Sequence, residues 1–330
     1  MGIVGGRRGH ARPHGAAATV LVAALLATSL GACAEPVDES RTVQTHIGRL
    51  HHVVDVDVTT PTPDRAAAIT VTYAADVESP ATVSGLINDV GTVADDLDYP
   101  TYLLTLVPAV DPDSALAVDA GFPGRPAKKD VLTTWFALTE ALLGAVTYDV
   151  RPDGETISVA SEGGAAHDIA EVQRIGHGTA TTTWVFHTGE ATFTASARLR
   201  PADVALFQAV QRNAGAAGQP VWARSWQLDR RRSHVRLDLD LVIGSGTVSA
   251  DQLTVARYGR TLEPLTRTSL TALAAVKTPA WLSLHHDDDT FASWASEDPA
   301  AQGRDPLDRG WDTWLGQQSA HSFRPASARR

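Results

Sequence analysis

The chain has 330 residues, a formal net charge of −10 and a single cysteine. An acidic surface repels phosphate backbones, so we expect no nucleic-acid partner. One cysteine cannot form an internal disulfide, so stability must come from a hydrophobic core, which a chain of this length can bury.

The first 32 residues have the composition of an export signal. They contain Arg7, Arg8 and Arg12 but no acidic residue, and residues 16–30 form an apolar run. This run is shorter than the roughly 20 residues that a membrane-spanning helix needs. Leu-Gly-Ala-Cys then occupies positions 30–33 and resembles a bacterial lipobox.

This resemblance, to actinobacterial-type lipoproteins, implies that residues 1–32 are a cleaved signal peptide and that Cys33 becomes the lipidated first residue. The lipid would hold the protein at the outer, extracytoplasmic face of the cell membrane. Since residues 1–32 carry three positive charges and no negative one, the mature part has a net charge of −13. Residues 33–45 are polar and predict a tether that spans roughly 20 Å if flexible.

Alternating apolar and polar residues predict the strands of the body. Val54, Val56 and Val58 indicate the first, and Val235 to Leu241 form the clearest one. Between strands, apolar residues recur at helical spacing, as after Ser79 and Pro80, which predict the start of a helix.

The predicted fold class is α+β. The strand–helix–strand order recurs with hairpins between the units, which favours tandem split βαβ (ferredoxin-like) sandwiches with antiparallel sheets. Residues 46–151 would form a first domain, 152–296 a second domain with an extra unit, and 297–330 a polar tail with a short amphipathic helix. The helices recur every 35–50 residues or so, which is also typical of a solenoid, but no fixed sequence signature accompanies that period.

His285, Asp287 and Asp289 are the candidate metal ligands. On an extended chain these three side chains would point to one side. Imidazole and carboxylate groups are the usual ligands of zinc or manganese. A solvated loop after a strand explains the same residues without a metal.

Two further segments are candidate binding surfaces. Arg230, Arg231 and Arg232 could bind an anion, because guanidinium groups pair with carboxylates and phosphates. A solvated hairpin tip is the alternative. In the tail, Leu307, Trp311, Trp314 and Leu315 would form one apolar stripe on a helix. It would contact either a partner or the protein's own sheet.

No common catalytic motif is present in the sequence. The preferred prediction is a lipid-anchored, non-catalytic binding or scaffolding module for a protein or a cell-envelope component. A metal-dependent hydrolase that uses His285, Asp287 and Asp289 is one alternative, and a solute-binding lipoprotein is another.

Overall fold

The computed structural model describes residues 39–62, 66–99, 101–215, 220–244, 248, 252–287, 289–297 and 310–323. These residues lie in one compact unit, which spans residues 38–330. The predicted signal peptide and Cys33 lie outside the described residues, as do Leu307 and Asp288.

The described residues form seven α-helices and twelve β-strands. The helices are α1 (Glu39–Ile47), α2 (Pro80–Asp96), α3 (Lys128–Ala141), α4 (Ala165–Ile175), α5 (Pro201–Asn213), α6 (Val255–Ala275) and α7 (Trp311–Ser319). The strands are β1 (Val53–Thr59), β2 (Ala67–Tyr73), β3 (Tyr102–Pro108), β4 (Ala115–Asp119), β5 (Ala145–Arg151), β6 (Gly154–Ala160), β7 (Thr182–His187), β8 (Ala191–Ser196), β9 (Val221–Arg230), β10 (Val235–Ile243), β11 (Ala280–His286) and β12 (Asp289–Ala295).

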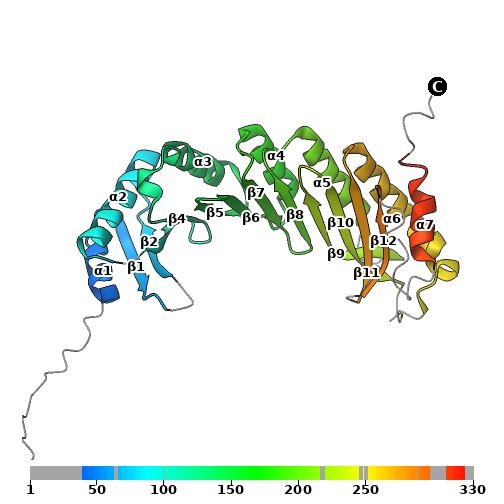
Figure 1. Ribbon diagram of the computed structural model, residues 1–330, viewed down its shortest axis with the longest axis horizontal. Coiled ribbons are helices and arrows are strands. Elements are labelled where there is room, and N and C mark those ends of the chain that lie inside the picture. The colour runs from blue at the N-terminus through cyan, green and yellow to red at the C-terminus, as the bar shows by residue number, and fades with distance from the viewer. Residues whose placement is uncertain are drawn as a thin grey trace, which may run out of the picture. The chain divides into compact units, whose positions relative to one another are not determined.

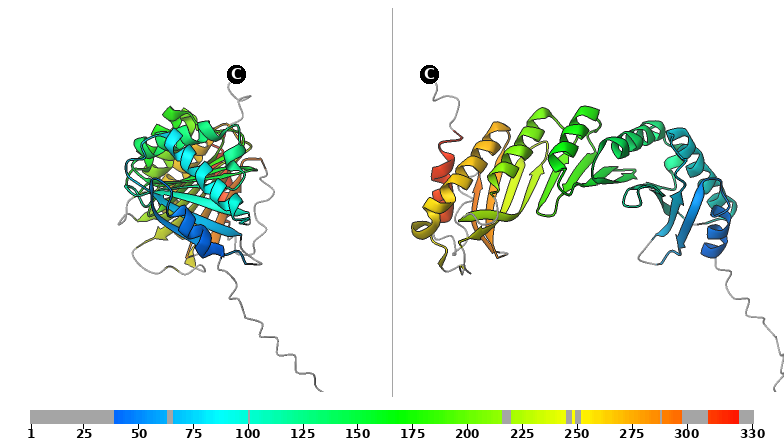
Figure 2. Two further views of the ribbon diagram at one scale, coloured as in Figure 1. Left: turned by 90° about the vertical axis from the view of Figure 1, so that its left-hand side faces the viewer. Right: turned by 180° about the vertical axis from the view of Figure 1, so that it is seen from behind.

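The strands lie side by side in their order along the chain, from β1 to β12, in a single sheet. Strands joined by a hairpin, such as β1 and β2, are antiparallel. Strands joined through a helix, such as β2 and β3 on either side of α2, are parallel. The helices line one face of the sheet, and the other face carries none of the described helices (Figures 1 and 2).

The predicted mixture of helices and strands is confirmed, but the predicted antiparallel sheets are instead one mixed sheet. Sequential strand order also differs from the interleaved order of a split βαβ unit, so that arrangement is not confirmed. The physical reason is that each of the helices α2 to α6 crosses over to the next strand position, which makes its two flanking strands parallel neighbours. A row of repeated helix–hairpin units results, as in a solenoid.

The boundary predicted between residues 151 and 152 lies in the turn of the β5–β6 hairpin, and the sheet continues across it. Residues 39–45, predicted as tether, lie in α1. Val43 and Ile47 are buried there because their i, i+4 spacing places both on the helix face that packs on the sheet.

Strand alternation explains the two faces of the sheet. In β10 the predicted core residues Val235, Leu237, Leu239 and Leu241 are buried on the helix side. The intervening Arg236, Asp238 and Asp240 occupy the helix-free face, because successive side chains of a strand point to opposite sides.

Helix starts follow the sequence signals where those are strong. Ser79 caps α2, since its side chain accepts a hydrogen bond from the Thr82 N–H at 3.1 Å, and Pro80 follows at the first helical position.

None of the described helices combines the length and hydropathy that crossing a membrane requires.

Candidate functional site

A polar cavity of about 360 Å³ opens on the helix-free face of the sheet, and we call it the face cavity. It is lined by the β7–β8 turn, by the start of β8, and by β9, β10 and β11. The lining residues are Thr188, Gly189, Glu190, Ala191, Thr192, Ser225, Trp226, Gln227, Asp238, Asp240 and His285. Most of these side chains are polar, and three of them are carboxylates.

The parallel β10–β11 ladder brings two carboxylates beside His285. Asp240 is the register partner of His285, and Asp238 precedes it by two residues on the same face. The Nε2 atom of His285 lies 3.5 Å from Asp238 Oδ1. Its Nδ1 atom lies 2.9 Å from the hydroxyl of Thr290, which fixes the orientation of the ring.

Asp238 is held in its ionised form. Burial alone would raise the pKa of this carboxyl, but hydrogen bonds from His285 and Ser283, together with the charge of Arg236, outweigh burial and lower the pKa. The Nε atom of Arg236 lies 2.8 Å from Asp238 Oδ2. The cavity therefore contains an ionised carboxylate at neutral pH, paired with Arg236.

Asp240 offers the second charged acceptor. Its Oδ2 atom accepts a hydrogen bond from Arg224 Nε at 2.9 Å. Its Oδ1 atom is buried and accepts no hydrogen bond from any described residue. A carboxylate oxygen accepts about two hydrogen bonds, so this oxygen has unused acceptor capacity.

The predicted metal ligands are not brought together on one strand face. β11 ends at His286, the chain reverses at Asp287 with a φ of 51°, and Asp289 begins β12 opposite His286. The turn breaks the alternation on which the prediction depended. Among the described residues, no group of three His, Cys, Asp or Glu side chains is placed to hold a metal ion.

His286 faces away from His285. It is buried on the helix side, where Nδ1 lies 2.8 Å from the carbonyl oxygen of Leu241 and Nε2 lies 2.9 Å from that of Val248. The Oδ1 atom of Asp287 lies 3.9 Å from the Nη2 atom of Arg224. Of the predicted set, only His285 lines the face cavity.

The three arginines of the predicted anion site lie in different environments, because β9 ends at Arg230. Arg230 is buried and forms an ion pair with Asp203 on α5, so its guanidinium is not available to an external anion. Arg230 points to the helix side because it shares the strand parity of Trp226 and Leu228. Arg231 pairs with Asp229 at 2.8 Å, and Arg232 is exposed.

The predicted partner stripe is buried wherever the structure describes it. Trp311 and Leu315 are fully buried and Trp314 is 9% exposed. Trp311 also donates a hydrogen bond from Nε1 to the carbonyl oxygen of Leu253 at 2.9 Å. These side chains pack against α6 and β12 because they cover the helix-side face of the last strand, so they are not an exposed contact surface.

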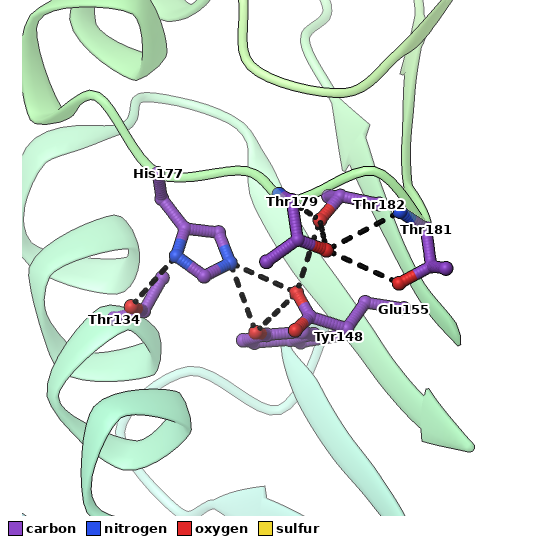
Figure 3. Close-up of polar contacts among 7 residues, drawn as sticks. All are labelled: Thr134, Tyr148, Glu155, His177, Thr179, Thr181 and Thr182. Carbon is purple, nitrogen blue, oxygen red and sulfur yellow. Dashed lines mark hydrogen bonds and ion pairs between the residues drawn. The ribbon is translucent and has the colours of Figure 1, made fainter. Parts of the chain in front are cut away.

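A second polar cluster lies on the helix side of the sheet, and sequence reasoning missed it (Figure 3). Tyr148 on β5 donates a hydrogen bond to Glu155 Oε2 on β6 at 2.9 Å. His177, from the α4–β7 loop, places Nε2 2.8 Å from the same oxygen. Its Nδ1 atom lies 3.2 Å from the hydroxyl of Thr134 on α3.

The environment of this cluster shifts two pKa values in opposite directions. Burial raises the pKa of Tyr148, and the adjacent Glu155 charge adds to that effect. Burial would also raise the pKa of Glu155, but hydrogen bonds from His177, Tyr148 and Thr182 and the charge of His177 hold it below its usual value. The side chains of His177 and Glu155 are 17% and 16% exposed, so the cluster is better placed to join helix and sheet than to bind a ligand.

The sequence signal for this cluster is the pair of glycines around His177. Gly178 has a φ of 132°, and a Cβ there would lie 2.8 Å from the Cα atom of Arg198. Only glycine permits the backbone at position 178 to lie this close to Arg198. In this loop conformation the His177 side chain points toward Glu155.

Three comparisons with known proteins complete the description of the site. No family model, curated protein or solved structure matches the chain.

Proposed function

We propose that the protein is a lipid-anchored, non-catalytic binding module, held through Cys33 at the outer face of the cell membrane, which binds a glycan of the cell envelope in the face cavity. The observation that carries this proposal is the face cavity itself. Its volume falls within the range of small-molecule sites, about 300–1,000 Å³.

The lining supports a ligand rich in hydroxyl groups. Each sugar hydroxyl both donates and accepts a hydrogen bond. Asp238 and Asp240 offer charged acceptors, which form stronger hydrogen bonds than neutral ones. Gln227, Ser225 and Thr192 offer further donors and acceptors on the neighbouring strands.

The position of the cavity also supports a polymeric ligand. The helix-free face continues across all twelve described strands, so a polysaccharide chain bound in the cavity could extend along the sheet to either side. Repeat proteins commonly bind extended ligands along such continuous surfaces.

Calorimetric titration of the purified protein with soluble cell-wall polysaccharide fragments tests the binding proposal. We expect the Asp240→Asn variant to bind about tenfold more weakly, because a charge-assisted hydrogen bond is lost. Asp57→Asn is the matched control, since Asp57 lies on the same face at the other end of the sheet. Failure of the wild-type protein to bind any fragment, or an equal loss in both variants, would contradict the proposal.

The anchor is tested separately by replacing Cys33 with Ala. We expect the variant to leave the membrane fraction or to keep its unprocessed mass. Unchanged membrane association together with an unchanged N-terminal mass would show that Cys33 carries no lipid.

A further inference from the structure

A second cavity, of about 480 Å³, lies where α5 and α6 pack side by side on the helix-covered side of the protein, and we call it the helix cavity. It is lined by Arg212, Asn213, Gly215, Pro220, Val221, Arg260, Thr261, Pro264, Leu265 and Thr268. It shares no lining residue with the face cavity.

The charge of this lining is opposite to that of the whole chain. Arg212 lies in the last turn of α5 and Arg260 near the start of α6, so each of the two helices contributes one arginine to the lining. No Asp or Glu is among the described lining residues. In a chain with a net charge of −10, the helix cavity is therefore a local site of positive charge.

Both guanidinium groups remain available. Arg230 and Arg267, which belong to neighbouring parts of the fold, pair with Asp203 and Glu263. Arg212 and Arg260 are exposed and form no ion pair with a described carboxylate. Each can present its planar fork of N–H donors to a carboxylate or phosphate.

The remaining walls indicate that the ligand also has an apolar part. Pro220, Val221, Pro264 and Leu265 line the cavity, and a volume of about 480 Å³ exceeds what a lone oxyanion would fill. Asn213, Thr261 and Thr268 add polar groups beside the two arginines.

We propose that the helix cavity binds an organic anion, a carboxylate or phosphate that carries an apolar group and is held between Arg212 and Arg260. This site is independent of the glycan site and would persist if that proposal failed. It also differs from the anion site expected at Arg230–Arg232, where one of the three arginines is buried.

Calorimetric titration of the full protein at low ionic strength tests the proposal with four probes: phenyl phosphate, benzoate, inorganic phosphate and benzyl alcohol. We expect at least one of the two aromatic anions to bind, and the one that binds identifies the anionic group. Inorganic phosphate and benzyl alcohol should bind more weakly, because inorganic phosphate lacks the apolar group and benzyl alcohol lacks the anionic group. Added salt should weaken binding, since the contact is a partly exposed charge pair.

Arg212→Gln and Arg260→Gln should each reduce the affinity for the bound anion about tenfold. Arg232→Gln is the matched control, because Arg232 is also exposed and lies outside the cavity. All three variants replace exposed side chains, and their melting temperatures verify folding. The proposal is overturned if neither aromatic anion binds, if benzyl alcohol or inorganic phosphate binds as tightly, or if Arg232→Gln loses as much affinity.

Discussion

Replacement of Asp203 with Asn should destabilise the protein by about 3 kcal/mol. Asp203 and Arg230 are each only 3% exposed, so solvent cannot screen the guanidinium once its partner charge is gone. Removing one member of a buried ion pair typically costs about 3–5 kcal/mol. We expect the lower end, because asparagine still accepts the Arg200 N–H bond that Asp203 accepts at 2.8 Å, and Arg230 keeps its 3.1 Å bond to the Ser196 carbonyl.

The double variant Asp203→Asn/Arg230→Met separates this explanation from simple loss of packing. With both charges removed, stability should return to within about 1 kcal/mol of the wild-type value. Urea denaturation measures the change. Repeat proteins can lose cooperativity, so hydrogen exchange of the α5 and β9 amides provides a local readout. If the double variant is no more stable than Asp203→Asn, an uncompensated buried charge is not the cause.

Three further substitutions test other parts of the fold. Leu239→Ala should cost about 2–5 kcal/mol in urea denaturation, because Leu239 is 1% exposed on the helix side, and a cost well below 1 kcal/mol would contradict that placement. Trp311→Ala should lower the free energy of unfolding by about 3–5 kcal/mol, because Trp311 is fully buried. Unchanged stability would instead favour the prediction that this side chain contacts a partner. Glu155→Gln should destabilise the protein at neutral pH. Because the folded-state pKa of Glu155 lies below its ordinary value of 4.5, the stabilisation is present above that value and is lost as the pH falls through the folded-state pKa, so wild type and variant should converge in acid. A stability difference that stays constant across this pH range would exclude the ionised carboxylate as the source.

The local elements could be predicted from the sequence because their signals are local. Alternation places Leu237 and Leu239 in the core, and the Ser79–Pro80 pair marks the start of α2. Strand order could not be predicted in the same way. The same strand–helix–strand segments can assemble in interleaved or sequential order, and the choice depends on how each helix packs over its own two strands rather than on the pattern within any segment.

Only part of the candidate site could be predicted from the sequence, because strand pairing brings together residues that are far apart in the chain. His285 lines the face cavity, but its carboxylate neighbours come from β10, about 45 residues earlier, through a parallel pairing that sequence spacing does not reveal. For Arg230, in contrast, the sequence itself contains the signal. Its alternation with Trp226 and Leu228 predicts the buried side of the strand, whereas the two arginines that follow it favour an exposed basic turn.

The sequential order of the strands also has a consequence for how the chain acquires its structure. Each strand pairs only with the strands immediately before and after it in the sequence, so no step has to wait for a distant segment to arrive. Low contact order of this kind is associated with rapid folding. A polypeptide that emerges N-terminus first can complete β1 and β2, place α2 over them, and extend the growing edge one unit at a time. Each newly formed edge then remains uncovered only until the next unit is added.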